Sequence, residues 1–401
     1  MRVLMVAPGT RGDVAPMAGL GGRLQAHGFE VAIAANPAYA PLVVSSGCEY
    51  RQLPGDLGRI IKRTAPAAKA AARDVLSSWR DLNEYMDQAA SGTLAAAEAG
   101  ADVVMANSVA PYAYDVAEAL GIPALGAHLQ PVEPSRAYPP VLLGSARNLG
   151  QLGNKLIGKR VAAGPAPYDA PSAKIRRELG LPRQSRQAAD RRRRRQQATI
   201  LHGISHTVLP RPADWHPGLV AAGYWWPPAQ PQWQPDAELA DFLAAGPPPV
   251  FVGFGSGARV DSDLVLEAAR KAGVRAVIQG GVVVTDDAVS VGEVPHEWLF
   301  PRMAAVVHHA GSGTTAAGLR AGVPTVCVPV FTDQPLWASR VAALGAGPPP
   351  VPFKKLTAER LGAAIEAAVS TPAYTARAKL LSARIAAEDG VAPVLAALRR
   401  I

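Results

Sequence analysis

A chain of 401 residues exceeds the size at which single hydrophobic cores stop growing, roughly 250–300 residues, so the sequence predicts two domains. Hydrophobic residues make up 49% of the chain and charged residues 18%, which excludes a disordered or collagen-like protein. The net charge of +9 raises the question whether nucleic acid or an anionic surface is a partner.

The first half of the chain alternates short apolar runs with helix-like segments. The run RVLMVAP at 2–8 has the length of a strand, and the segment 9–28 reads as a glycine-rich turn followed by a helix. This order is typical of a parallel sheet with crossover helices. The strands of this half are expected at 2–8, 29–36, 101–107, 122–129 and, as the last one, 200–209.

Two segments interrupt this pattern. Residues 55–100 contain what reads as a long amphipathic helix, and residues 130–200 read as irregular chain followed by helix. The second segment ends in a basic run, 183–195, without interleaved aromatic residues that could stack on bases. We expect a solvated loop there and no nucleic-acid partner, with peripheral contact to an anionic membrane as the alternative.

The cysteines and the N-terminus indicate the compartment. Cys48 and Cys327 lie far apart and neither forms a CxxC pair, so neither a zinc site nor a disulfide framework is favoured. The first apolar run ends at Pro8, which makes it too short for a signal peptide or a membrane span. The sequence therefore predicts a cytoplasmic protein.

A stretch rich in proline and tryptophan, 223–236, separates the halves, because its prolines block helix and interior strand. The strand–helix pattern then restarts, with strands expected within 249–257, 275–281, 303–309 and 324–330. The predicted fold class is α/β, with two doubly wound domains whose ligands bind at the carboxyl ends of the strands.

The stretch VVHHAGSGTT, 306–315, ends a strand and opens a helix. Gly311, Ser312 and Gly313 therefore lie at a helix N-terminus, where free N–H groups and the helix dipole form an anion site, and Thr314 adds a hydroxyl. The alternative is a tight turn in which Ser312 or Thr314 caps the helix. No metal site is predicted, because adjacent strand histidines point to opposite faces and lack a nearby carboxylate or cysteine.

The segment 294–347 resembles the donor-binding signature of the family 1 glycosyltransferases, in the bacterial antibiotic and sterol branch. The resemblance is carried by His309, Gly311, Thr314, AGVP at 321–324, Pro329 and the pair Asp333–Gln334. It extends to GTRGDVAP at 9–16, HTVLPRPADW at 206–215, GYWWP at 223–227 and PPVFVGFGS at 248–256.

The resemblance implies the GT-B fold, two facing Rossmann-like domains with the active site in the cleft between them. It implies an acceptor domain at 1–222, a linker at 223–236 and a nucleotide-sugar domain at 237–384. A final helix, 385–401, would cross back onto the first domain.

The activity that the resemblance implies is inverting hexosyl transfer from a UDP- or TDP-linked sugar, without a cofactor or a metal ion. The acceptor would be a hydroxyl of a hydrophobic natural product or sterol-like aglycone, and residues such as Tyr138, Val141, Leu142 and Leu143 support a greasy acceptor unless they pack in the core. A nucleotide-sugar epimerase or a non-catalytic homologue on the same fold is the alternative. The oligomeric state is not predicted.

On the donor side, the resemblance places His309 and the backbone N–H groups of 311–314 at the diphosphate. Ser256 is a second diphosphate candidate, whose alternative role is a helix cap. Asp333 and Gln334 would bind sugar hydroxyls, while Asp333 has the alternative role of capping the next helix. Val294 and His296 are expected to contact the nucleotide base.

On the acceptor side, the resemblance makes Asp13 the candidate base, provided that burial raises its pKa; the alternative is support of a helix N-terminus. Thr10 and Arg11 are expected to shape the same loop. His128 is a second candidate for base or acceptor contact, and its alternative role is a satisfied, partly buried histidine. Ala310 departs from the family pattern, which has glycine there.

Overall fold

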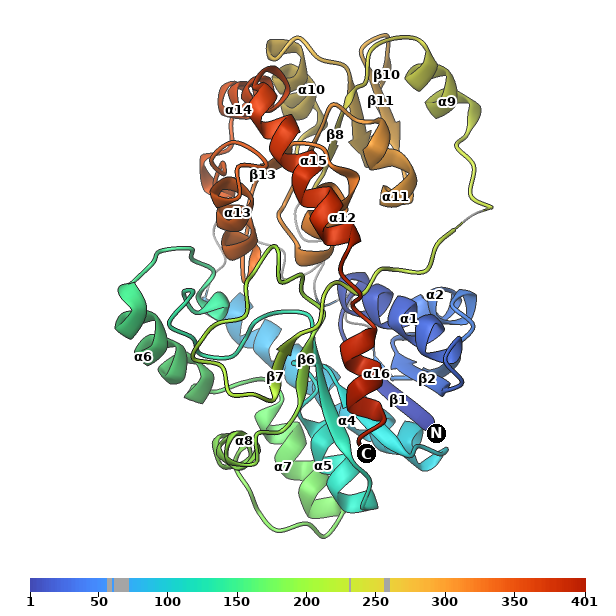
Figure 1. The fold of residues 1–401 in the computed structure, drawn as a ribbon, viewed down its shortest axis with the longest axis vertical. Coiled ribbons are helices and arrows are strands. Elements are labelled where there is room, and N and C mark those ends of the chain that lie inside the picture. Colours follow the sequence, from blue (N-terminus) through green and yellow to red (C-terminus); the bar gives the residue numbers. More distant parts are fainter. Residues whose placement is uncertain (56–59, 61–71, 231, 256–259) are drawn as a thin grey trace.

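A computed structural model describes residues 1–401 apart from 56–59, 61–71, 231 and 256–259. The described residues form two α/β domains stacked one above the other, each built on its own sheet (Figure 1). Within the same ranges no helix combines the length and the apolar character that a bilayer span requires.

The first domain contains a parallel sheet that, in the described residues, has seven strands in the order β3-β2-β1-β4-β5-β6-β7. The strands are β1 (Arg2–Ala7), β2 (Glu30–Ala35), β3 (Glu49–Gln52), β4 (Val103–Ala106), β5 (Ala124–His128), β6 (Ile200–His202) and β7 (Leu219–Ala221). The prediction that 200–209 is the last strand was wrong, since β7 follows it. The strand order reverses between β1 and β4, and the carboxyl ends there open the crevice in which such sheets bind ligands.

Helices cover both faces of this sheet, which explains why its central strands are continuous apolar runs. One face packs against α1 (Arg11–Gln25) and the opposite face against α4 (Ala72–Glu98) and α5 (Tyr112–Leu120). The remaining helices of the domain in its described residues are η1 (Pro37–Tyr39), α2 (Ala40–Ser45), η2 (Val141–Leu143), α6 (Gly150–Ala163), α7 (Asp169–Glu178) and α8 (Arg186–Arg195).

The basic run forms helix α8, so the prediction of a solvated loop was wrong. The Ser185 hydroxyl caps the helix by accepting from the N–H of Ala188 at 3.3 Å. Arg192 pairs with Glu118 of α5 at 2.6 Å, and the guanidinium of Arg193 lies 4.4 Å from the Tyr114 ring centre. Some of the arginines therefore bind the helix to the rest of the domain. Such tertiary contacts cannot be predicted from the pattern of charges in the sequence.

The second domain contains a sheet with the order β10-β11-β9-β8-β12-β13 in the described residues, parallel except that β10 pairs antiparallel with β11. The strands are β8 (Val250–Gly253), β9 (Ala276–Gln279), β10 (Val284–Thr285), β11 (Ala288–Val291), β12 (Ala305–His308) and β13 (Thr325–Cys327). The helices are α9 (Ala237–Ala244), α10 (Ser262–Lys271), α11 (His296–Leu299), η4 (Phe300–Arg302), α12 (Ser312–Ala321), α13 (Gln334–Ala343), η5 (Phe353–Lys355), α14 (Ala358–Ser370) and α15 (Pro372–Ala386).

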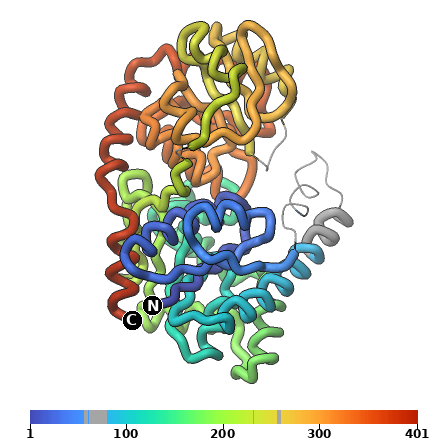
Figure 2. Tube along the Cα trace, turned by 90° about the vertical axis from the view of Figure 1, so that its right-hand side faces the viewer, coloured from blue at the N-terminus to red at the C-terminus, as the bar shows by residue number. Residues whose placement is uncertain are grey.

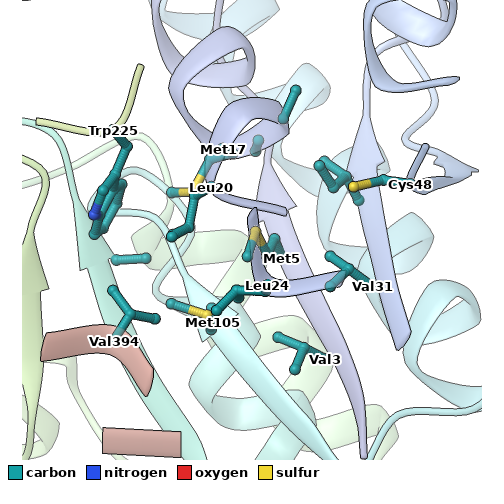
Figure 3. Close-up of a cluster of buried hydrophobic side chains, with 14 of the residues drawn as sticks. Val3, Met5, Met17, Leu20, Leu24, Val31, Cys48, Met105, Trp225 and Val394 are labelled. Carbon is teal, nitrogen blue, oxygen red and sulfur yellow. The ribbon is translucent and has the colours of Figure 1, made fainter. Parts of the chain in front are cut away.

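The chain crosses between the domains a second time after α15, and its last helix, α16 (Ala392–Leu398), packs on the first domain (Figure 2). Val394 of α16 lies in the core of the first domain together with Trp225 and Met105 (Figure 3). The two crossings contact each other, because the indole N–H of Trp225 donates to the carbonyl of Gly390 at 2.9 Å. Glu388 also accepts from the Ser205 hydroxyl at 2.8 Å, which ties the returning chain to the first domain.

An apolar cluster joins the two domains. Tyr138 and Val141 of the first domain belong to the same buried cluster as Leu336 and Trp337 of the second. Tyr138 and Val141 are therefore core residues in this state, whereas Leu142 and Leu143 are 54% and 51% exposed.

Candidate active site

Asp13 lies in the first turn of α1, just beyond the carboxyl end of β1. Its Oδ2 accepts from the N–H of Thr10 at 2.9 Å and from the Thr10 hydroxyl at 3.4 Å, which makes a capping box. Asp13 therefore supports the helix N-terminus, which was its alternative role. This role uses one of its two carboxylate oxygens.

The surroundings of Asp13 come from both domains. Burial raises the pKa of its carboxyl, the N–H of Thr10 lowers it, and the negative charge of Asp333 raises it again. The side-chain amides of Asn107 and Gln130, which follow β4 and β5, lower it, and the net pKa is raised. Since Asp333 belongs to the second domain, its charge acts on Asp13 across the boundary between the domains.

The two histidines at the end of β12 have different environments, as strand alternation predicts. His308 is fully buried, and its Nδ1 accepts from the N–H of Ala310 at 2.9 Å. His309 lies against glycines: a Cβ on Gly311 would be 2.5 Å from its Nε2, and a Cβ on Gly255 would be 3.1 Å from its Cε1. Burial lowers the pKa of His309 to about 4, so its imidazole is neutral near pH 7 and offers one N–H.

The turn between β12 and α12 is strained at Ala310. Its φ of 62° lies in the left-handed region, which costs a residue with a Cβ roughly 1–2 kcal/mol. Its methyl group is fully buried in the interdomain cluster. The methyl thus stands at a backbone position suited to glycine, and packing offsets part of the strain.

The N-terminus of α12 faces the site without a side-chain cap. Gly311 is the N-cap residue, and no capping side chain occurs there in the described ranges, so the alternative in which Ser312 or Thr314 caps the helix was wrong. The first backbone bond of the helix runs from the N–H of Thr315 to the carbonyl of Gly311 at 2.9 Å. The preceding N–H groups, Ser312 to Thr314, are those that a helix leaves for a ligand.

Asp333 precedes α13 and is held by its own neighbours. Its Oδ2 accepts from the indole N–H of Trp337 at 2.7 Å, and its Oδ1 accepts from the Thr332 hydroxyl at 3.1 Å. Burial raises the pKa of the carboxyl by more than these two hydrogen bonds lower it, so the pKa is raised above its ordinary value. Asp333 is the N-cap residue of α13, but within the described residues its carboxylate accepts no N–H of the helix, so the alternative in which its side chain caps the helix was wrong.

Gln334 is buried and already uses its amide oxygen. Oε1 accepts from the N–H of Val330 at 2.8 Å and from the N–H of Phe331 at 3.2 Å. The amide oxygen therefore shapes the loop before α13, which leaves the NH₂ group for a ligand.

His296 and Val294 lie at the start of α11. The imidazole of His296 stacks on Phe300 with ring centres 4.3 Å apart, and burial together with the Arg11 charge lowers its pKa to about 4. Arg11 belongs to the first domain but pairs with Glu293 at 3.4 Å. Arg11, expected on the acceptor side, thus reaches the residues expected at the nucleotide base. Ser256 lies outside the described residues.

His128 takes part in a group that the sequence did not predict. Glu133 joins two imidazoles at the ends of β5 and β6: its Oε1 is 2.8 Å from His128 Nδ1 and its Oε2 is 2.7 Å from His202 Nε2. Burial raises the pKa of Glu133, but His202 and His128 lower it further, so it stands well below its ordinary value. His202 also stacks on Trp215 with ring centres 4.4 Å apart.

Among the described residues, His128, Glu133 and His202 form a group that could hold a metal ion, because their ligand atoms all lie within 4.8 Å of one another. Their direct hydrogen bonds already satisfy the carboxylate, and His128 is buried and bonded, as its alternative role predicted. A sequence signal existed for His128, which lies at the end of a predicted strand, but not for His202, which lies near the start of the strand predicted at 200–209. The pairing of β5 with β6, which brings them together, has no local signal.

Comparisons with known proteins agree with this geometry. Residues 3–139 match the family described as glycosyltransferase family 28 N-terminal domain, and residues 254–400 match the erythromycin biosynthesis protein CIII-like C-terminal domain. O-mycaminosyltylonolide 6-deoxyallosyltransferase of Streptomyces fradiae is 37% identical, covering 98% of this chain and 95% of its own length. A sterol 3-beta-glucosyltransferase of Arabidopsis thaliana is 30% identical over 98% of this chain and 64% of its own length.

A solved structure shows the same fold. The crystal structure of the glycosyltransferase VinC in complex with DTDP aligns with a TM-score of 0.69 at 21% identity, covering 100% of this chain and 99% of that chain. The two domains described above are thus those of the GT-B fold, as predicted. The chain belongs to the family 1 glycosyltransferases, in the branch of antibiotic and sterol enzymes, and is a hexosyltransferase.

Proposed function

We propose that this enzyme transfers a hexose with inversion, and without a divalent metal ion, from a UDP- or TDP-linked sugar to a hydroxyl of a hydrophobic aglycone. The observation that carries the proposal is that helix α1, which bears Asp13, contacts helix α12 of the second domain, and that the charge of Asp333 acts on Asp13. A candidate base and a candidate sugar ligand then lie on opposite sides of one cleft. We also propose the domain boundaries 1–222, 223–236, 237–384 and 385–401.

In this proposal the diphosphate lies at the N-terminus of α12. The neutral imidazole of His309 donates one hydrogen bond to a phosphate oxygen, and the N–H groups of Gly311 to Thr314 provide further donors. As the bond to the sugar breaks, negative charge develops on the leaving diphosphate. Fixed donors of this kind each contribute roughly 2.7–4 kcal/mol to the transition state, so a metal ion is not needed to neutralise the charge.

Sugar hydroxyls would bind to Asp333 and to the free NH₂ group of Gln334. The bond from Trp337 fixes the orientation of the Asp333 carboxylate, so little rotamer freedom is lost on binding. Val294 and His296 would contact the nucleotide base, with Arg11 beside them. Ser256 remains a proposed diphosphate contact from its position after β8.

Asp13 would take the proton of the acceptor hydroxyl. The capping box engages Oδ2 and fixes the carboxylate, and the raised pKa makes the proton transfer more efficient near neutral pH. A single base on the acceptor side favours direct displacement, which inverts the anomeric carbon. Thr10 holds Asp13 in place, and His128 is proposed as an acceptor contact through the ring nitrogen that Glu133 does not use.

The names of the relatives suggest the acceptor class. One is named for moving a 6-deoxyallosyl group to O-mycaminosyltylonolide and another for glucosylating a sterol. Leu142 and Leu143 are exposed, and their 3₁₀ helix η2 contacts α13 of the donor domain. We therefore propose an acceptor with a large apolar ring system.

The test is a reaction panel. The enzyme is incubated with UDP-glucose, TDP-glucose and TDP-6-deoxyhexoses against macrolide and sterol aglycones, with and without a chelator. We expect diphosphate release that depends on the acceptor, a product heavier by one hexosyl group, an inverted anomeric carbon by NMR, and no effect of the chelator. Release that never depends on an acceptor would sink the proposal, and a retained configuration would refute Asp13 as the base of a single displacement.

A further inference from the structure

Helix α6 turns its leucines away from the protein. Leu149, Leu152 and Leu156 are 37%, 66% and 62% exposed, and their spacing places them on one side of the helix. A surface helix of a globular domain ordinarily does the opposite and buries its apolar stripe. We call these three leucines, together with Lys159 and Arg160 of the next turn, the outer face of α6.

The opposite side of the helix is fixed to the domain by polar and small residues. Asn154 is 1% exposed, and its amide accepts from the N–H of Leu149 at 3.0 Å and donates to the carbonyl of Arg136 at 3.4 Å. Gly158 is buried against Pro134, and a Cβ there would lie 3.1 Å from the proline ring. The helix cannot rotate its leucines inward without breaking these contacts, so their exposure belongs to the folded protein.

The charged residues along this segment of the sequence have a single sign. Residues 134–168 contain five cations, Arg136, Arg147, Lys155, Lys159 and Arg160, and no aspartate or glutamate. Lys155 is used inside the domain, where it pairs with Asp214 at 2.7 Å. Lys159 and Arg160 are exposed on the leucine side, with no ion pair in the described part of the chain.

We propose that the outer face of α6 docks the enzyme on an anionic lipid bilayer. Leucines flanked by lysine and arginine are the pattern of a helix that lies in a membrane interface, with the apolar side chains among the acyl chains and the cations at the headgroups. Figure 1 shows α6 at the outer edge of the first domain. A second copy of the chain is a poor occupant, because it would bring the same cations together.

The basic helix α8 is a weaker candidate for this contact. Arg186 pairs with Asp169 at 2.7 Å, Arg192 pairs with Glu118 at 2.6 Å, and Arg193 pairs with Asp190 of its own helix. Arg191, Arg194 and Arg195 are exposed to solvent. No large apolar side chain of α8 accompanies them, since its sequence is RQAADRRRRR. The two helices therefore provide a matched comparison, one with leucines and one without.

The experiment is co-sedimentation of the full chain with vesicles of phosphatidylcholine alone or mixed equally with phosphatidylglycerol. The variants are Leu152→Ser with Leu156→Ser, and Lys159→Glu with Arg160→Glu. The controls are Arg191→Glu with Arg195→Glu, which changes the net charge by the same amount, and Leu380→Ser, an exposed leucine of α15 at 43%. Circular dichroism and thermal melting check that all of them fold.

We expect the wild type to pellet with the mixed vesicles and not with phosphatidylcholine alone. Each α6 double variant should partition at least roughly tenfold more weakly, because the serine variant loses apolar side chains from the acyl region and the glutamate variant replaces two cations at the headgroups by anions. Both controls should pellet as the wild type does. Equal pelleting of the α6 variants and the wild type overturns the proposal. A wild type that pellets with neither kind of vesicle also overturns it and would leave an acidic protein as the candidate partner for this face. An α8 variant that loses as much binding as the α6 variants overturns it as well.

Discussion

Replacing Gly311 by alanine should displace His309, because the added methyl group would occupy the place of the imidazole. The Cβ would lie 2.5 Å from Nε2, where ordinary contact begins near 3.4 Å. Gly311 has a φ of −62°, which alanine adopts without strain, so the backbone has no reason to change. Gly313 is the matched control, since a Cβ there meets nothing within 4 Å.

The size of the effect follows from this clash. The ring must move by about 1 Å, and a displacement of that size in a catalytic group costs roughly 100-fold in rate. Removing a single preorganised donor costs roughly 100- to 1,000-fold, or about 2.7–4 kcal/mol. We therefore expect Gly311→Ala to approach the loss of His309→Ala, while the effect on stability stays near 1 kcal/mol or less, the cost of a weaker N-cap.

The assay compares single-turnover rates of Gly311→Ala, Gly313→Ala, His309→Ala and the double variant Gly311→Ala/His309→Ala, using the best donor and acceptor from the reaction panel. If Gly311 acts through His309, the double variant is no slower than His309→Ala alone, because the two changes remove one interaction. A Gly311→Ala enzyme within about threefold of wild type, beside a slow His309→Ala, would refute the reasoning. So would a Gly313→Ala enzyme that is equally slow.

Other substitutions test the carboxylates. Asp13→Asn should abolish turnover, while binding of the nucleoside diphosphate, measured by calorimetry, persists. In the wild type, kcat/KM should fall as the pH drops through the pKa of Asp13, because the base must be ionised; this pKa lies above the ordinary carboxylate value of about 3.9. Glu133→Ala should lower the free energy of unfolding in urea by about 3–5 kcal/mol, since it leaves His128 and His202 without their carboxylate, and Glu133→Gln should cost less. Because folding lowers the pKa of Glu133, its contribution to the free energy of unfolding is fully present above the unfolded pKa of about 4.3 and is lost as the pH falls from there through the lower, folded pKa. If the stabilities of wild type and Glu133→Gln changed in parallel with pH, this reasoning would be contradicted. Prolonged dialysis against a chelator should leave the melting temperature unchanged, and a drop would show that His128, Glu133 and His202 hold a metal ion.

The sequence predicted those parts of the fold that have a local signal. Long apolar runs bounded by glycine or proline, such as 2–8 and 303–309, correspond to β1 and β12, because strands buried on both faces must be apolar throughout. Strands β3, β7, β10 and β11 escaped prediction. With three and two residues, β7 and β10 are too short to show a period. Helix α8 was missed because its arginines are stabilised by partners elsewhere in the chain.

The candidate site was predictable where a motif fixes the backbone, as at the turn of Gly311 to Thr314. Contacts between distant segments had no such signal. The use of the Gln334 oxygen by the loop before it, and the link from His128 through Glu133 to His202, depend on tertiary placement. The same holds for Tyr138 and Val141, whose apolar character fits a binding pocket and an interdomain core equally well.

The hydrogen bond between Trp225 and Gly390 has a consequence for motion. Both connections between the domains are tied together at one point, so they cannot shift independently of each other. Any rotation of one domain against the other would have to keep this point fixed or break the bond. Such a rotation would also have to part the buried cluster that joins Tyr138 and Val141 to Leu336 and Trp337, whereas the core around Val394 would move with the first domain as one body.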